Sequence, residues 1–255
     1  MPPAVGTFFA AAFGAVVGSF LNVCIYRLPR GMSIVWPASA CPHCGRGLAW
    51  FENVPLLSYA VLRGRCRTCS GAISTRYPTV EALTAAMFAL GWWYYGPGTL
   101  LAARLLFGCA LIVLFAIDLE HQLLPNAITL PGIIVGFLFS LVVEPGWMAS
   151  LIGIVVGGGV LYLIAEGYYR LRHEEGLGMG DVKMLAMIGA FLGWKLTLVA
   201  LMFASVSGSI IGIGLIAARR GSMSHALPFG TFLAIGAAVS ATLGQQVLIW
   251  YLNLW

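Results

Sequence analysis

The stretch GTLLAARLLFGCALIVLFAI, residues 98–117, carries a single charged residue, Arg104, and runs directly into Asp118. An α-helix needs about 20 such residues to cross a bilayer. Comparable stretches recur along the 255-residue chain, of which 60% is hydrophobic and only 9% charged. Soluble domains carry about 25% charged residues. The sequence therefore predicts an all-α polytopic membrane protein.

About eight transmembrane helices are expected, at residues 5–26, 79–96, 98–117, 127–143, 147–169, 181–194, 196–217 and 229–251. The segment 181–217 could also be one long span, broken at Gly193-Trp194-Lys195. No basic residue precedes the first segment, which indicates a span rather than a cleavable signal. We expect three parts: the first transmembrane helix (1–26), a polar module (27–78) and a transmembrane domain (79–255).

The positive charges follow membrane sidedness rather than a nucleic-acid surface. If the loop 27–78 is cytoplasmic, 12 of the 14 Lys and Arg residues lie on that side, and only Arg104 and Lys195 lie on the other. An excess of Lys and Arg marks cytoplasmic loops. The net charge of +5 thus predicts a lipid bilayer as partner and no nucleic acid. The same topology places the connections 118–126, 170–181 and 218–228 in the cytoplasm.

Two CxxC pairs lie in the polar module, CPHC at 41–44 and CRTC at 66–69. Two such knuckles can close a tetrahedral thiolate site, for which Zn²⁺ is the usual ion. The expected ligands are Cys41, Cys44, Cys66 and Cys69. A closed four-cysteine site has a structural role, so we expect a small zinc-ribbon-like module. Two disulfides or unligated thiols remain alternatives.

Two aspartates at the ends of apolar segments are the candidate catalytic residues. Asp118 ends the third predicted span and Asp181 opens the sixth, at the same depth on the cytoplasmic side. Two carboxylates in one site can hold one proton between them. The ionised one then activates water, and the protonated one polarises a scissile carbonyl. From the residues alone, helix capping or cation pairing and a proton-coupled transporter stay open.

Residues beside these aspartates are candidates for substrate contact. Gly178 and Gly180 would let a substrate backbone approach Asp181 closely. Lys183 follows on the same segment, and Pro228 and Gly230 begin the last predicted span.

Several motifs in order resemble those of the type IV prepilin peptidases, which are GxGD-type membrane aspartic proteases and N-methyltransferases. They are GSFLNVCIYRLP (18–29), the CxxC pair enclosing NVPLLSY (53–59) and LRGRC (62–66), RYP (76–78) with Glu81, DLEHQLLP (118–125), GMGDVK (178–183) and LPFG (227–230). The resemblance covers nearly the whole chain. Two residues depart from the family pattern: Asn126 stands where Asp is common, and Thr231 where a proline often follows.

The resemblance implies a multi-pass protein of the bacterial inner membrane, with its active site and zinc module facing the cytoplasm. It implies cleavage of the basic leader of type IV prepilins or type II secretion pseudopilins after a glycine. The new N-terminus would then be methylated from S-adenosylmethionine. A leader peptidase without methyltransferase activity is the alternative within this family.

No Rossmann-type glycine loop for S-adenosylmethionine is present in the sequence. The polar candidates for that cosubstrate lie in and around the 27–78 module: Asn22, Arg27, Glu52, Asn53, Arg63 and Arg76. The sequence does not predict which pilin is cleaved or the oligomeric state.

Overall fold

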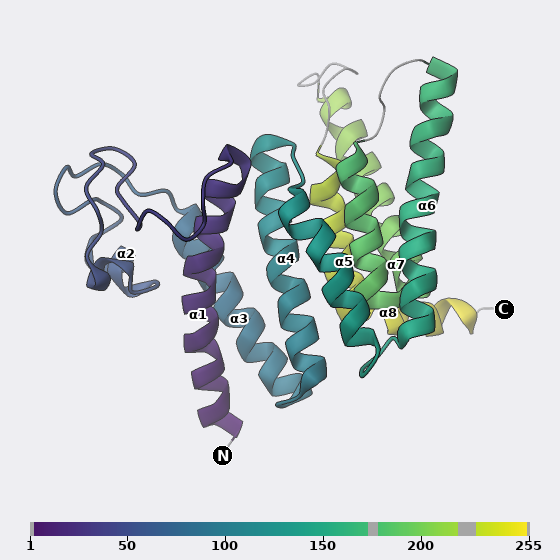
Figure 1. Ribbon diagram of the computed structural model, residues 1–255, viewed down its shortest axis with the longest axis horizontal. Coiled ribbons are helices and arrows are strands. Elements are labelled where there is room, and N and C mark those ends of the chain that lie inside the picture. The colour runs from purple at the N-terminus through teal and green to yellow at the C-terminus, as the bar shows by residue number, and fades with distance from the viewer. Residues whose placement is uncertain (1–2, 173–177, 219–227, 254–255) are drawn as a thin grey trace. The chain divides into compact units, whose positions relative to one another are not determined.

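The computed structural model describes residues 3–172, 178–218 and 228–253, and its regular elements are helices. Figure 1 shows their order along the chain. They are α1 (Pro3–Arg27), η1 (Leu28–Arg30), η2 (Trp50–Asn53), α2 (Leu57–Val61), α3 (Arg76–Tyr95), α4 (Thr99–His121), α5 (Asn126–Ser140), α6 (Trp147–Arg172), α7 (Met179–Ala217) and α8 (Phe229–Leu252).

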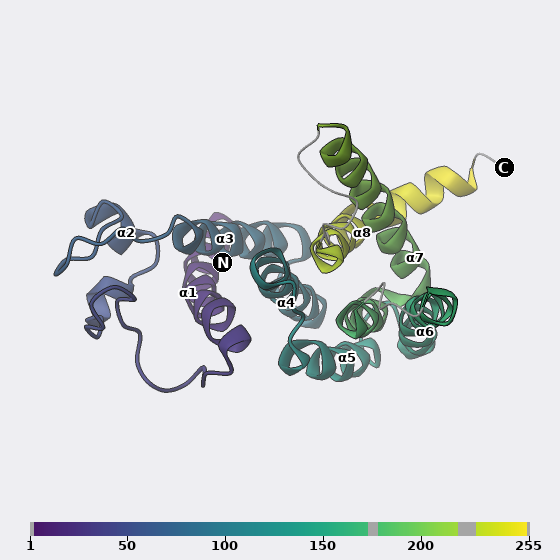
Figure 2. The same ribbon diagram turned by 90° about the horizontal axis from the view of Figure 1, so that it is seen from above.

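The chain divides into two compact units, residues 1–113 and 114–255, with the boundary inside α4. In the first unit, α1 and α3 lie side by side (Figures 1 and 2). Small residues permit this approach: a Cβ on Gly14 would lie 2.7 Å from Cβ of Phe88, and one on Gly18 would lie 2.8 Å from Cα of Glu81. Close glycine contacts of this kind are typical of helices packed within membranes.

In the second unit, α7 packs against α5, α6 and α8. Its contact with α6 brings the two backbones together, because a Cβ on Gly153 would overlap the carbonyl oxygen of Gly189. On the other side of α7, a Cβ on Gly236 of α8 would overlap the carbonyl oxygen of Ala200. These contacts leave no room for a side chain, so α7 is held between two neighbours at backbone distance.

Five of the described helices are long and apolar enough to cross a membrane: those beginning at Ala4, Thr99, Trp147, Met179 and Phe229. The eight predicted spans are therefore not all confirmed. The helix over the predicted span 127–143, α5, has only 15 residues, about 22 Å at 1.5 Å per residue. That length falls short of the roughly 30 Å hydrocarbon core. The helix α3, over the predicted span 79–96, is not one of the five.

The predicted break in 181–217 is confirmed at Gly193. The two predicted spans form one element of 39 residues, α7, interrupted where Gly193 adopts φ 74° and ψ 167°. A left-handed φ is open to glycine without steric cost. The ring of Pro145 also packs there, 2.9 Å from where a Cβ would stand. An unbroken helix of this length would span about 58 Å, roughly twice the hydrocarbon core.

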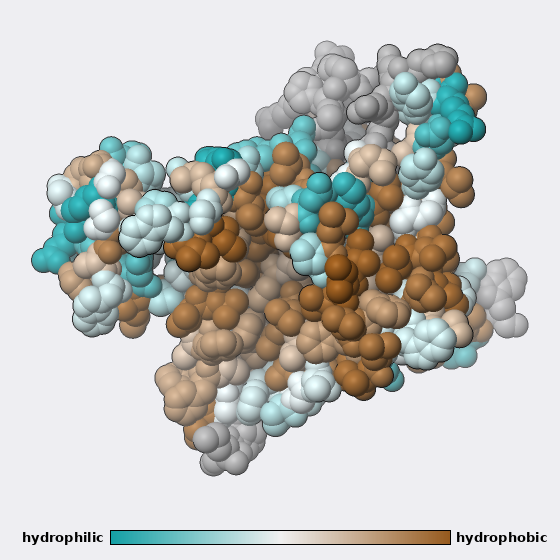
Figure 3. Space-filling view, viewed as in Figure 1, coloured by the Kyte–Doolittle hydropathy of each residue, from teal (hydrophilic) through white to brown (hydrophobic). Residues whose placement is uncertain are grey.

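Large apolar side chains cover the outer faces of these helices. Phe8 is 68% exposed, Leu163 70% and Ile213 67%. Figure 3 shows hydrophobic residues gathered over the long helices and hydrophilic residues over the segment that contains α2. Surfaces this apolar are suited to lipid, and the chain is a multi-pass membrane protein.

Candidate functional site

Asp118 lies in the last turn of α4 and is 5% exposed. The helix ends three residues later, at His121. The next residue, Gln122, takes a left-handed φ of 51°, and its N–H donates to the Asp118 carbonyl at 2.9 Å. Pro125 then caps α5. The turn from Gln122 to Pro125 thus ends the helix just beyond the buried carboxyl group.

Asp118 and Asp181 line one cavity of about 310 Å³, and the charge of Asp118 acts electrostatically on Asp181. The remaining lining comes from the α4–α5 turn and the start of α7: Gln122, Leu123, Leu124, Asn126, Gly178, Gly180 and Lys183. The structure therefore brings together, within one compact unit, two acidic residues that lie on different helices. It also brings Gly178, Gly180 and Lys183 into the same cavity.

Leu124 explains why two of the candidate residues are glycine. A Cβ on Gly180 would lie 2.9 Å from Cβ of Leu124, and a Cβ on Gly230 would lie 2.9 Å from its Cδ1. The same added atom on Gly230 would approach Oδ2 of Asp118 to 3.0 Å. Both glycines let the first turns of α7 and α8 close around the Asp118 turn. At Gly178 a Cβ would make only an ordinary contact, 3.4 Å from Oδ2 of Asp181.

Thr231 contacts Asp118 directly, which the sequence reasoning missed. Its backbone N–H and its hydroxyl both donate to Oδ2 of Asp118, at 2.6 Å and 3.0 Å. In the sequence, Thr231 stands out only as a departure from the proline of the family pattern. A hydroxyl in the first turn of the last predicted span was the available signal. Pro228 caps the same helix, α8, with extended backbone.

Asn126, the other residue that departs from the family pattern, binds Lys183. The Nζ of Lys183 donates to Oδ1 of Asn126 at 2.9 Å, which joins the start of α7 to the start of α5. Both residues line the cavity. The ammonium group is therefore held by Asn126 at the cavity that Asp118 and Asp181 also line.

The four predicted ligands come together in the 27–78 segment, where all four Sγ atoms lie within 4.8 Å of one another. The Sγ atoms of Cys41 and Cys69 are 3.9 Å apart, and the cysteines are free. Thiolates 2.3 Å from a tetrahedral zinc ion lie about 3.8 Å from one another, whereas a disulfide needs about 2.05 Å. The donor set could hold zinc. Backbone N–H groups of Cys69 and Thr68 lower the pKa of the Cys66 thiol to about 6. Burial and the neighbouring thiols outweigh a backbone bond from Gly71 and raise the pKa of the Cys69 thiol to about 11.

The two knuckles share one hydrogen-bond pattern. Cys41 N–H donates to the Arg46 carbonyl and Cys66 N–H to the Gly71 carbonyl, each at 2.9 Å. The left-handed position that follows the second cysteine is Gly45 in one knuckle, with φ 71°, and Ser70 in the other, with φ 55°. Gly71 follows Ser70 and makes room for His43, whose Cδ2 would lie 2.8 Å from an added Cβ.

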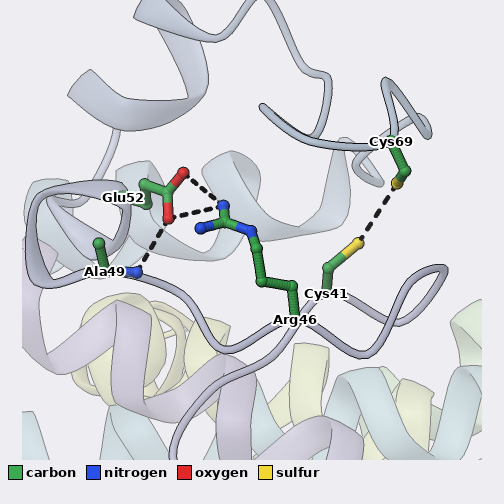
Figure 4. A network of polar contacts seen from close by, with 5 residues as sticks. All are labelled: Cys41, Arg46, Ala49, Glu52 and Cys69. Atoms are coloured by element: carbon green, nitrogen blue, oxygen red, sulfur yellow. Dashed lines mark hydrogen bonds and ion pairs between the residues drawn. The ribbon is translucent and has the colours of Figure 1, made fainter.

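An ion pair fixes the first knuckle to η2 (Figure 4). Nη2 of Arg46 donates to both Glu52 carboxylate oxygens, at 2.7 Å and 2.9 Å, and the Ala49 N–H donates to Oε2 at 2.9 Å. The guanidinium group of Arg46 and the Ala49 N–H lower the pKa of the Glu52 carboxyl. Glu52 was a candidate for cosubstrate binding, and its carboxylate holds this loop together.

Two other candidates for S-adenosylmethionine also make internal contacts. The guanidinium group of Arg27 donates to the carbonyls of Ser33 and Pro37, at 2.9 Å and 2.7 Å. The amide of Asn22 donates to the Tyr77 carbonyl at 3.0 Å. Its Oδ1 is buried and accepts no hydrogen bond from the described residues.

The last three candidates lie nearer the surface. Asn53 and Arg63 are exposed, and the guanidinium group of Arg76 lies 5.4 Å from the centre of the Tyr77 ring. Binding of the cosubstrate by any of the six stays a prediction.

Comparison with known proteins shows to which family the chain belongs. The model of the bacterial peptidase A24 N-terminal domain matches residues 12–95, and that of the type IV leader peptidase family matches residues 105–213. The chain is 38% identical to the prepilin leader peptidase/N-methyltransferase of Aeromonas hydrophila, over 94% of this chain and 92% of that protein. It is 40% identical to that of Burkholderia pseudomallei (strain 1026b), over 96% and 87%, and 35% identical to that of Pseudomonas putida, over 97% and 94%.

No solved structure matches the chain. The two family models together cover most of the chain, and the Aeromonas hydrophila relative aligns over 92% of its own length. The chain belongs to the type IV leader peptidase family.

Proposed function

We propose that this protein removes the leader from type IV prepilins or type II secretion pseudopilins and then methylates the new N-terminal amine. The relatives named prepilin leader peptidase/N-methyltransferase support both activities, because they match over nearly the whole chain. The observation that carries the peptidase assignment is the shared cavity of Asp118 and Asp181.

The two aspartates act as an acid–base pair on a peptide bond. The ionised carboxylate takes a proton from water as the water oxygen bonds to the scissile carbonyl carbon. The protonated carboxyl gives its proton to the carbonyl oxygen, which forms a neutral tetrahedral diol. When the C–N bond breaks, the leaving amine takes the proton that the first aspartate received. One diol hydroxyl becomes the carbonyl of the new carboxyl group and returns its proton to the second aspartate. The pair returns to one proton shared between two carboxyl groups.

We place this site on the cytoplasmic side. Asp118 ends α4 and Asp181 begins α7, and one cavity contains both, so these two helix ends lie on the same side of the membrane. The Lys and Arg distribution puts that side in the cytoplasm of a bacterial inner membrane, where basic leaders begin. Eight crossings, with α7 contributing two around Gly193, complete the proposed topology.

Zinc is the proposed structural ion of the 27–78 module, held by Cys41, Cys44, Cys66 and Cys69. A closed thiolate set leaves no position for substrate, so its role is to fold the module. S-adenosylmethionine is the proposed cosubstrate and supplies the methyl group for the N-terminal amine. Of its six candidate residues, Asn22 keeps a buried acceptor, and Asn53 and Arg63 keep exposed polar groups.

A cleavage assay on the detergent-solubilised protein tests the acid–base pair. Asp118→Asn and Asp181→Asn should each abolish cleavage of a prepilin. Both should retain metal and still methylate an already cleaved pilin. Glu120→Gln is the matched control, because Glu120 is an exposed carboxylate two positions from Asp118 on the same helix, and it should cleave normally. Cleavage retained by either aspartate variant would remove the mechanism.

A further inference from the structure

The two aspartates differ in the hydrogen bonds that reach them. Oδ2 of Asp118 receives two donors from Thr231, the backbone N–H at 2.6 Å and the hydroxyl at 3.0 Å. Both residues are 5% exposed, so water does not compete freely for these contacts. The carboxylate of Asp181 receives a backbone hydrogen bond from Gly178 and feels the charge of Asp118. The stronger support for negative charge is therefore at Asp118.

The position of Thr231 in its helix adds to this difference. Thr231 is the third residue of α8, and the first N–H groups of a helix have no partner one turn back. Its N–H also approaches the Pro228 carbonyl at 3.2 Å, within the same turn. The positive end of the α8 dipole thus faces Oδ2 of Asp118, which favours an anion there.

We propose that Thr231 is a positioning residue that keeps Asp118 ionised, so that Asp118 is the general base and Asp181 holds the shared proton. This role assignment rests on the acid–base pair proposed above. Thr231 occupies Oδ2 of Asp118, which leaves Oδ1 to accept the proton of the attacking water. The protonated carboxyl of Asp181 then donates to the scissile carbonyl oxygen.

Other charged groups near Asp118 do not account for the asymmetry. Lys183 of α7 lines the same cavity, but its Nζ bonds to Asn126. Glu120 and His121 follow Asp118 on α4 and are exposed. The sequence of α5 has no titratable residue, and that of α8 has only Tyr251, near its far end. All of these groups stay unchanged in the variants below.

Three substitutions separate the two donors. Thr231→Ser keeps both, Thr231→Val removes the hydroxyl at nearly constant shape, and Thr231→Pro removes both. Proline is tolerated in the first turn of a helix, and the N–H that it removes contacts only Asp118 and the Pro228 carbonyl in the described structure. The measurement is kcat/KM for prepilin cleavage as a function of pH. Methylation of an already cleaved pilin reports that each variant is folded.

The acid limb of the pH profile is the expected readout, because activity falls there when the general base becomes protonated. Hydrogen bonds to charged groups contribute about 1.5–3 kcal/mol, and 1.36 kcal/mol corresponds to one pH unit. We expect Thr231→Ser to match the native profile. In Thr231→Val the acid limb should move to higher pH by about 1 unit, and in Thr231→Pro by more, with the basic limb in place.

Two results would overturn the assignment. If the basic limb moves instead, Asp118 is the acid and the roles are reversed. If Thr231→Val and Thr231→Pro cleave slowly with both limbs in their native positions, Thr231 only ties α8 to α4. Either result leaves the acid–base pair intact as long as Asp118→Asn and Asp181→Asn are inactive. Cleavage by those two variants would instead refute the proposed function itself.

Discussion

The four-cysteine cluster and the aspartate cavity differ in how far apart in the sequence their residues are. Each CxxC pair makes its own turn, with the same hydrogen bonds from Cys41 and Cys66, and the two turns meet within a 29-residue segment. The aspartate cavity needs the end of α4 and the start of α7, while the start of α8 supplies Thr231. Cysteine spacing therefore predicts its site directly, whereas the aspartates become a site only through helix packing.

Loss of the metal should have the largest effect. In Cys66→Ser one of the four ligands is gone, and binding of zinc to such sites contributes on the order of 10 kcal/mol to folding. We expect metal content to fall from one ion per chain to none and limited proteolysis to cut within residues 27–75. Cys109→Ser, in α4 and outside the cluster, is the control and should keep its metal. A stable, metal-free Cys66→Ser module would contradict the structural role.

Alanine substitutions at three glycines of the site should differ in their effect on cleavage in a fixed order. Gly230→Ala should have the strongest effect, because its Cβ would crowd both Leu124 and the Asp118 carboxylate. Displacement of a catalytic group by about 1 Å costs on the order of 100-fold in rate. In Gly180→Ala the added Cβ would contact only Leu124, so this variant should lose less activity. In Gly178→Ala the added Cβ would make only ordinary van der Waals contacts, so activity should stay near native.

The measurement is kcat for prepilin cleavage, with methylation of a cleaved pilin as the folding control. Equal losses in all three variants would show that Leu124 does not set the approach of the helices.

The ion pair in the zinc module should make a smaller, pH-dependent contribution. The pKa of Glu52 is lowered by Arg46 and the Ala49 N–H, so its contribution to stability is present above the usual pKa of about 4.3 and is lost as pH falls through the lowered value. The native chain should therefore melt at a higher temperature than Glu52→Gln at neutral pH, and the gap should close in acid. A gap independent of pH would show that the charge of Glu52 is not what matters.

The smallest expected effect is tighter retention of zinc when Ser70 is replaced by glycine. Its left-handed φ of 55° costs a non-glycine residue about 1 kcal/mol. Ser70→Gly should relieve part of that cost and slow the release of zinc to a chelator by a few-fold. Gly45→Ser, at the matching position of the other knuckle, should speed release by a similar factor. Identical release from both variants would mean that the two turns are not equivalent.

Sequence patterns predicted those features that depend on residues close together in the chain. The clustering of the four cysteines and the break at Gly193 are of this kind, since each depends on residues close in the chain. Asp118 and Asp181 were paired only through their expected depth in the membrane. The role of Leu124 could not be predicted, because its contacts with Gly180 and Gly230 join the α4–α5 turn to the first turns of α7 and α8.

The contact between Thr231 and Asp118 could not be predicted from a sequence pattern either. As a departure from a family pattern it carried no structural information, yet it donates both hydrogen bonds to Asp118. Only the packing of α8 against the end of α4 reveals this contact. The shortness of α5 was also hidden, because the apolar run 127–143 continues past Ser140, where the helix ends.

The distance between the carboxyl groups of Asp118 and Asp181 in an experimental structure tests the central claim most directly. Two carboxyl groups that share a proton through one water lie no more than about 6 Å apart, the length of two hydrogen bonds. We predict such a separation in lipid or detergent, with Thr231 bonded to Asp118. Carboxyl groups facing opposite membrane surfaces, or separated well beyond that reach, would contradict the account.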